Sequence, residues 1–312
     1  MNKAFIFPGQ GSQNIGMGKD FYDAFPIAKE TFQIIDDILH YKLSNIIFNG
    51  PNHELTMTVN TQPALMAMSM SILNVIKQQT EKNINFLCSY VAGHSLGEYS
   101  ALCAAASLNL EDTAKLLQIR GSSMQEACIQ GEGAMAACIG ISLTKLEEII
   151  NDQRSFGVCQ IANDNIVGQV VISGHTAVIE KVISIVKDLG YKAIKLNVSG
   201  PFHCSLMKNA ERNMIEALDQ VQINKPIIPL IANVTAKPVT DQLEIKQNLI
   251  TQICGKVRWR ETLDELANLG VEEVVEIGAG KALTGMLKKT THALKLTNVS
   301  NLAELDIFLQ SV

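Results

Sequence analysis

One short segment restricts the fold of this chain more than any other. Residues 93–97 read Gly-His-Ser-Leu-Gly, the G-x-S-x-G pattern. The apolar residues 87–92 before it are typical of a buried strand, and the alanine-rich residues 98–106 after it are typical of a buried helix. A sharp strand-to-helix turn needs small residues around its serine, and the two glycines supply them. The pattern therefore predicts a nucleophile at Ser95, with the helix N-terminus directing backbone N–H groups toward developing negative charge.

The rest of the chain alternates between short apolar runs and longer helical patterns, which favours an α/β architecture. Residues 131–197 have an order of their own, strand–helix–strand–strand–helix–strand, which is typical of a ferredoxin-like unit. We therefore expect residues 1–130 and 198–312 to form a large hydrolase-like α/β domain around a central, mostly parallel sheet. Residues 131–197 would be a small ferredoxin-like (βαββαβ) subdomain inserted into it.

Turn residues divide the chain into expected elements. Strands are expected at residues 3–7, 87–92, 134–139, 158–162, 169–173, 192–196, 228–232 and 273–277. Helices are expected at about 20–39, 60–79, 98–106, 111–127, 176–189, 204–219, 243–253 and 260–269. A further helix should open at Thr144-Lys145-Leu146-Glu147, which reads as a capping box, and Gly190 suits the position after a helix end.

Composition excludes several classes of function. The chain has 312 residues, of which 26 are Lys or Arg and 31 are Asp or Glu, so its formal net charge is −5. This mildly acidic balance argues against a nucleic-acid-binding protein. No run of ~18 uncharged apolar residues suggests a membrane span, and no signal-peptide pattern is visible at the N-terminus. We therefore expect a cytoplasmic protein.

The cysteines agree with this location. There are seven, and no two form a C-x-x-C pair. An odd number without paired spacing argues against a disulfide framework or a zinc site. The positions are Cys88, Cys103, Cys128, Cys138, Cys159, Cys204 and Cys254. We expect most of them to be small buried side chains in a reducing compartment, with no metal or retained cofactor.

A nucleophilic serine needs a base, and the chain offers six histidines: His40, His53, His94, His175, His203 and His292. His94 adjoins Ser95, but consecutive side chains diverge on a tight turn. His203 follows Gly200-Pro201-Phe202 at a rigid turn that enters a helix, so position alone ranks it modestly above the others.

A third, acidic member of a triad is harder to find. Asp152, Asp164 and Asp188 lie between Ser95 and His203 in the sequence, but all three fall within the inserted unit. A Ser–His dyad, with the imidazole N–H bonded to a backbone carbonyl, fits the sequence better.

Several separated motifs now point to one family. They stand in order along nearly the whole chain, from residue 4 to about 290: Phe7-Pro8-Gly9-Gln10-Gly11-Ser12-Gln13, Gly93-His94-Ser95-Leu96-Gly97-Glu98-Tyr99-Ser100-Ala101, Arg120-Gly121 with Met124-Gln125, Gly200-Pro201-Phe202-His203 and Glu276-Ile277-Gly278-Ala279-Gly280. In this order the chain resembles the malonyl-CoA:acyl-carrier-protein transacylases, the acyltransferases of bacterial type II fatty acid synthesis. That family also has a small ferredoxin-like subdomain. It usually has proline where this chain has Ala279, and we interpret this glycine-rich turn as structural.

The resemblance implies a role for each matching position. Ser95 would be the acylated nucleophile, and His203 would be its general base and acid. The backbone N–H groups of Gln10 and Leu96 would form the oxyanion hole. Gln252 would offer its backbone carbonyl to His203 and would belong to the substrate-binding residues.

Two further positions would bind the acyl group. Arg120 would hold the malonyl carboxylate, because a guanidinium pairs a carboxylate bidentately, and it should reject acetyl groups, which would leave the cation unpaired. Phe202, beside the base, would limit bulk at the malonyl α-carbon. Without the resemblance, Arg120 would read as an exposed helix residue.

The function implied is transfer of malonyl from coenzyme A to the phosphopantetheine thiol of acyl carrier protein, through a malonyl-serine intermediate with ping-pong kinetics. Coenzyme A is then a substrate and not a cofactor. The carrier is an acidic partner, for which Lys256, Arg258, Arg260, Lys288 and Lys289 are candidate docking residues. We expect a monomer that supplies fatty acid synthesis.

Three alternatives remain open at this point. A trans-acting malonyltransferase of a polyketide assembly line would have the same residues. An acyl hydrolase on the same scaffold would have no use for a buried Arg120. A carrier-binding scaffold without activity would have no need of Ser95 and His203.

Overall fold

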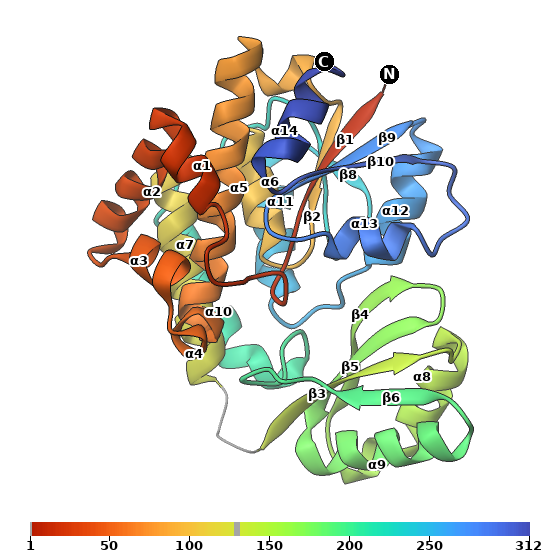
Figure 1. Cartoon of the computed structure of the whole chain (residues 1–312). Helices are drawn as coiled ribbons and strands as arrows, with labels where there is room; N and C mark the ends of the chain where they lie inside the picture. Colours follow the sequence, from red (N-terminus) through yellow and green to blue (C-terminus); the bar gives the residue numbers. More distant parts are fainter. Residues whose placement is uncertain (1, 128–131) are drawn as a thin grey trace.

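The computed structural model describes residues 2–127 and 132–312 (Figure 1). Cys128 and Gly131, the first residue of the expected small subdomain, lie outside the described residues. The rest contains two separate sheets with helices packed against each.

The larger sheet has six strands in the order β10-β9-β1-β2-β7-β8. Its strands are β1 (Lys3–Phe7), β2 (Tyr90–Gly93), β7 (Leu230–Ile231), β8 (Pro238–Val239), β9 (Glu273–Ile277) and β10 (Lys295–Val299). All neighbours are parallel except β7 and β8. The carboxyl ends of the parallel strands therefore meet at one edge, where α/β folds place their sites.

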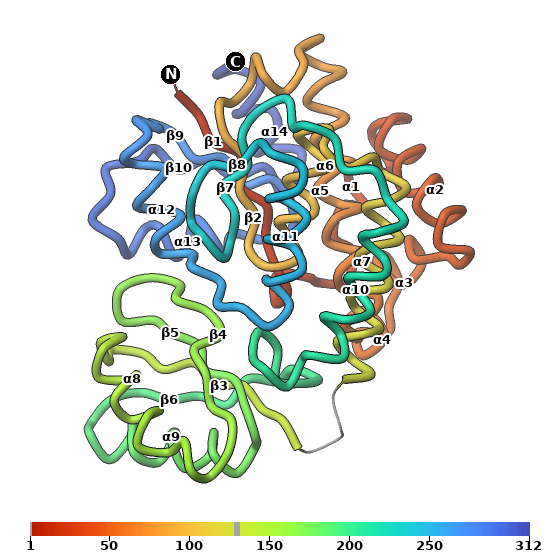
Figure 2. The backbone as a smooth tube through the Cα atoms, turned by 180° about the vertical axis from the view of Figure 1, so that it is seen from behind, coloured from red at the N-terminus to blue at the C-terminus, as the bar shows by residue number. Residues whose placement is uncertain are grey.

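Helices cover both faces of this sheet. Side chains alternate along β1: Phe5 belongs to an apolar cluster that includes side chains of α2, α5, α6 and α7, whereas Ile6 belongs to a second cluster that includes side chains of α12 and α13. Figure 2 shows α10 and α11 on the side of the molecule opposite to the view in Figure 1. The helices are α1 (Lys19–Ala24), α2 (Pro26–Leu39), α3 (Leu43–Asn49), α4 (Asn52–Thr56), α5 (Thr58–Thr80), α6 (Gly97–Ala104), α7 (Leu110–Glu126), α8 (Leu143–Asp152), α9 (Thr176–Asp188), α10 (Lys208–Asp219), α11 (Gln242–Gln252), α12 (Trp259–Asn268), α13 (Ala282–Leu287) and α14 (Leu302–Leu309).

The smaller sheet is antiparallel and has the order β4-β5-β3-β6. Its strands are β3 (Gly133–Ile139), β4 (Cys159–Ile166), β5 (Gln169–His175) and β6 (Lys192–Lys195). With α8 and α9 they follow the βαββαβ order and share an apolar cluster of their own, which includes Ile172 and Val182. In Figure 1 this unit lies below the larger sheet. The mixed α/β fold with one mostly parallel sheet and one ferredoxin-like sheet is confirmed.

Strand β4 ties the small unit to the larger one. Asp164 N–H donates to the Val257 carbonyl oxygen at 2.9 Å, and Val257 N–H donates to the Ala162 carbonyl oxygen at 2.8 Å. The Asp164 carboxylate also pairs with Arg260 at 2.8 Å. These contacts hold the two units side by side next to the carboxyl edge of the large sheet.

Three local expectations were wrong. Residues 20–39 form two helices, because Pro26 opens α2 and the chain bends at Phe25. Helix α8 is capped by the Ser142 side chain, which accepts from Lys145 N–H, and not by Thr144. Residues 163–165 continue β4 and are not a turn, because Asn163 and Asp164 pair with Val171 and Val170 of β5 and the segment at Val257 lies alongside Asn163.

Within the described ranges, no helix is both long enough and apolar enough to cross a membrane.

Candidate active site

Ser95 stands on a sharp turn at the carboxyl edge of the large sheet. Strand β2 ends at Gly93 and α6 begins at Gly97. Ser95 has φ 55, in the left-handed region that non-glycine residues rarely adopt. A Cβ on Gly93 would lie 1.9 Å from the Gly97 carbonyl oxygen, and a Cβ on Gly97 would lie 2.3 Å from the Phe7 carbonyl oxygen. Both glycines are therefore required sterically, and the predicted strand–turn–helix context of Ser95 is confirmed.

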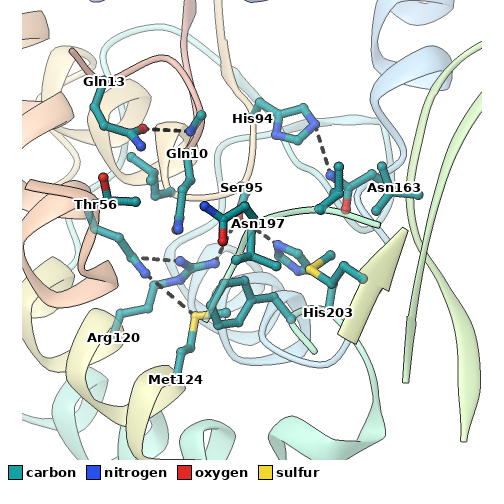
Figure 3. Close-up of a pocket in the computed structure, with 18 residues that line it drawn as sticks. Gln10, Gln13, Thr56, His94, Ser95, Arg120, Met124, Asn163, Asn197 and His203 are labelled. Atoms are coloured by element: carbon teal, nitrogen blue, oxygen red, sulfur yellow. Dashed lines mark hydrogen bonds between the residues drawn. The ribbon is translucent and has the colours of Figure 1, made fainter. Parts of the chain in front are cut away.

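His203 lies beside Ser95 although 108 residues separate them in the sequence. The distance from Ser95 Oγ to His203 Nε2 is 2.7 Å. His203 Nδ1 lies 2.8 Å from the backbone oxygen of Gln252. Since a carbonyl oxygen only accepts, Nδ1 carries the proton and Nε2 is left to accept from the Ser95 hydroxyl. Figure 3 shows His203 and Arg120 on two sides of Ser95.

Burial sets the charge of the imidazole. His203 is buried, and this burial, together with the nearby Arg120 cation, lowers the pKa of His203 to about 3. The ring is therefore neutral over the physiological pH range and available as a base.

Arg120 is a buried cation at the same place. Its side chain is 1% exposed. Its Nη1 donates to Gln62 Oε1 at 2.7 Å, and its Nη2 donates to Gln252 Oε1 at 2.9 Å and to Ser95 Oγ at 3.2 Å. No salt bridge to Arg120 occurs among residues 2–127 and 132–312. A buried guanidinium held only by neutral groups is arranged to receive an anion from outside.

The nearest acid, Glu98, reaches this cluster indirectly. Its Oε2 accepts from Gln252 Nε2 at 2.6 Å and from Asn233 N–H at 3.2 Å. Burial raises the pKa of Glu98 to about 7. Gln252 thus links Glu98 to Arg120 with its side chain, while its backbone oxygen orients His203.

A cavity of about 310 Å³ opens beside Ser95. The large domain contributes Gln10, Leu96, Arg120 and Phe202 to its wall, and the small unit contributes Met135 and Val171. Within the described part of the chain, no acceptor is bonded to the backbone N–H of Gln10 or Leu96. The cavity therefore combines a nucleophile, a base, two free amides and a cation inside a largely apolar wall.

Comparison with known proteins now identifies the family. A family model described as an acyl transferase domain matches residues 4–305. The chain belongs to the acyl transferase family. The malonyl CoA-acyl carrier protein transacylase of Bacillus subtilis (strain 168) is 42% identical over 311 residues, which cover 99% of this acyl transferase and 96% of the relative.

Similar solved structures support the same family assignment. The acyl-carrier-protein-S-malonyltransferase from Bartonella henselae is 47% identical, with a TM-score of 0.97 and coverage of 100% of this acyl transferase and 99% of that chain. A malonyl-transacylase solved in complex with its type II PKS acyl-carrier protein is 36% identical, with a TM-score of 0.96 and full coverage of both chains. The resemblance stated from the motifs is therefore confirmed.

The structure brings together every site residue expected from the sequence of this acyl transferase. Gln10, Leu96 and Phe202 line the cavity, whereas Gln252 is fully buried behind Arg120 and does not reach the cavity. Sequence reasoning missed Gln62 and Asn233. Gln62 is one of several polar residues in α5, and no local signal marked either residue.

Proposed function

We propose that this acyl transferase moves malonyl from malonyl-CoA to the phosphopantetheine thiol of acyl carrier protein. The observation that carries the proposal is Arg120, a buried cation without a carboxylate partner in the described structure, 3.2 Å from Ser95 Oγ. A malonyl group esterified to Ser95 would bring its carboxylate to this guanidinium. The names of the relatives agree with this substrate.

The first half-reaction acylates Ser95. Its Oγ attacks the thioester carbonyl carbon while the hydroxyl proton passes to His203 Nε2. The N–H groups of Gln10 and Leu96 stabilise the resulting oxyanion, a contribution of about 3–4 kcal/mol per donor in comparable sites. When the intermediate collapses, the C–S bond breaks and the imidazolium protonates the departing coenzyme A thiolate.

The second half-reaction runs the same steps in reverse order. The carrier's thiol gives its proton to His203 and attacks the malonyl-serine ester. The C–O bond to Ser95 then breaks, and His203 returns the proton to Oγ. Gln252 keeps Nδ1 protonated throughout, so Nε2 alternates between accepting and donating.

Mass spectrometry of the intact protein tests this proposal. Brief incubation with malonyl-CoA should add one malonyl group, and acetyl-CoA at the same concentration should add far less acetyl. Addition of carrier protein bearing phosphopantetheine should then remove the adduct and malonylate the carrier. Steady release of coenzyme A without carrier and without adduct would instead favour the hydrolase, and no reaction would favour the carrier-binding scaffold.

His203→Ala should lower the rate of acylation by roughly 10²–10⁴-fold, the usual contribution of a general base. In the wild-type enzyme the rate should stay nearly constant from pH 8 down to pH 5, because the depressed pKa keeps His203 neutral. Rapid-quench measurement of malonyl-enzyme formation checks both. A wild-type rate that falls by half near pH 6.5, where an ordinary histidine titrates, would contradict this account.

Phe202→Ser should raise the methylmalonyl-to-malonyl ratio of kcat/KM, because Phe202 lines the cavity beside His203. The added methyl group needs room at the α-carbon, and one such group in an apolar pocket is worth about 1–3 kcal/mol. Competition between the two thioesters measures the ratio. An unchanged ratio would show that Phe202 does not limit the size of the group at the α-carbon.

We further propose that the enzyme acts in the cytoplasm, as a monomer, in fatty acid synthesis. The six cysteines that the structure describes are free thiols, which suits a reducing compartment. The subdomains would be residues 1–130 with 198–312, and residues 131–197. A role in a polyketide assembly line is the second candidate, since one solved relative is bound to a type II PKS carrier.

Two of the five candidate docking cations are already paired with carboxylates of this chain. Arg258 pairs with Glu261, and Arg260 pairs with the buried Asp164. We therefore propose Lys256, Lys288 and Lys289 as the cations that meet the acidic carrier.

A further inference from the structure

The turn that carries Ser95 extends beyond the end of β7, the strand that pairs with β2 on one side. Strand β2 pairs with β7 only at Val91 and Ala92. Gly93 and Ser95 lie beyond this ladder, so their backbone groups on that side have no strand beside them. On the other side, His94 N–H donates to the Phe7 carbonyl oxygen at 3.0 Å. The turn is thus fastened by backbone on one side only.

The side chain of Asn233 fills the missing side. Asn233 comes two residues after the end of β7. Its Oδ1 accepts from Ser95 N–H at 2.7 Å, and its Nδ2 donates to the Gly93 carbonyl oxygen at 2.7 Å. One acceptor and one donor are what a neighbouring peptide group would offer, so the carboxamide substitutes for the next residue of the ladder.

Asn233 is itself held on both sides. Its backbone N–H donates to Glu98 Oε2 at 3.2 Å, and its backbone oxygen accepts from Arg258 N–H at 2.9 Å. The residue is fully buried. A left-handed conformation at a serine is strained, and it persists only where the surroundings determine it.

We propose that Asn233 is a positioning residue: its side-chain amide holds Ser95 in the strained conformation that places Oγ between His203 and Arg120. It touches no substrate, and it acts through the backbone of Gly93 and Ser95. The inference rests on the proposed function only in taking Ser95 as the nucleophile.

A fluorophosphonate probe tests this without malonyl-CoA. Ser95 Oγ attacks phosphorus, fluoride leaves, and His203 takes the hydroxyl proton. Asn233→Ala should label roughly 10–100-fold more slowly than the wild type, the scale expected when a reacting group is slightly misplaced. Asn268→Asp, an exchange at the exposed last residue of α12, is the control and should label at the wild-type rate.

Asn233→Asp adds a readout that a merely structural residue would not give. Its carboxylate can accept from Ser95 N–H but repels the Gly93 carbonyl oxygen. Once protonated, it can donate there as the amide does. Burial raises the pKa of such a carboxyl. Labelling of Asn233→Asp relative to Asn233→Ala should therefore rise severalfold from pH 8 to pH 5.5.

The other groups that titrate or carry charge around this position are present in both variants, so a pH effect that they exert equally on both drops out of the ratio of labelling rates. Glu98, Arg258, Arg120 and His203 are the same in both variants. Fluorescence of Trp259, the one tryptophan of the chain, reports folding because its buried ring packs edge-on against His94. If Asn233→Ala does not fold, the labelling rate of Asn233→Asp is divided by that of the wild type at each pH instead.

Two results would overturn the proposal: labelling of Asn233→Ala within twofold of the wild type, or a ratio that does not change with pH. Wild-type enzyme that labels but takes up no malonyl would refute the proposed substrate and leave the role of Asn233 standing. Wild-type enzyme that does not label would refute both.

Discussion

Ser95→Ala should take up no malonyl from malonyl-CoA and should transfer to carrier protein roughly 10⁶-fold more slowly than the wild type, the scale of nucleophile loss in serine enzymes. Ser95 Oγ is the oxygen within hydrogen-bond distance of both His203 and Arg120, so no neighbouring group in the described structure can take its place. Intact mass after brief incubation measures the adduct, and a carrier-malonylation assay measures the transfer.

Ser100→Ala is the matched control for this variant. Ser100 is a buried serine in α6, the helix that follows Ser95, and does not line the cavity. Its replacement should leave the adduct unchanged. A malonyl adduct on Ser95→Ala would show that another side chain is acylated, and peptide mapping would locate it.

Arg120→Ala should lower kcat/KM for malonyl-CoA by roughly 10²–10⁴-fold, because two hydrogen bonds to a charged group are lost at about 1.5–3 kcal/mol each. Acetyl-CoA lacks the carboxylate, so its kcat/KM should change far less. The selectivity for malonyl over acetyl should therefore collapse. Steady-state kinetics with the two thioesters measure this ratio directly.

Two variants show whether charge or shape is responsible. Arg120→Lys keeps the positive charge but cannot form the planar fork, so it should recover part of the selectivity. Arg212→Ala removes an exposed arginine on α10 and should have no effect. An equal loss with malonyl-CoA and acetyl-CoA in Arg120→Ala would mean that Arg120 supports the site structurally and does not read the carboxylate.

Much of the fold was predictable because local patterns and tertiary structure agree. Strands β1 and β9 have the predicted bounds, since short β-branched or aromatic runs bounded by turn residues are typical of buried strands. A prediction failed where turn-forming residue types lie inside a paired strand. Asn163 and Asn165 read as turn residues, yet they continue β4, because β4 stays paired with β5 as far as Ile166 and the segment at Val257 lies alongside Asn163. Strand β10 and helix α14 were not predicted, and their threonine- and asparagine-containing surroundings masked the apolar pattern.

The candidate site likewise has features that the sequence predicts and features that only the tertiary structure shows. The sequence alone determined the chemistry of the elbow: Gly93 and Gly97 are needed by local sterics, and the strand–helix context selected Ser95. It also ordered the motifs well enough to suggest His203, Arg120 and Gln252. Their roles as base, carboxylate ligand and orienting group stay predictions until the variants are measured.

Only the tertiary structure decided how these groups meet. The Gln252 carbonyl facing His203 was implied only by the family resemblance, and position in the sequence could not show that Arg120 is buried without a carboxylate partner in the described chain or that Asn233 completes the elbow. The hydrogen bonds among them join residues between 49 and 140 positions apart. Local sterics act over a few residues and are written in the sequence, whereas contacts across the fold depend on how whole helices and strands pack.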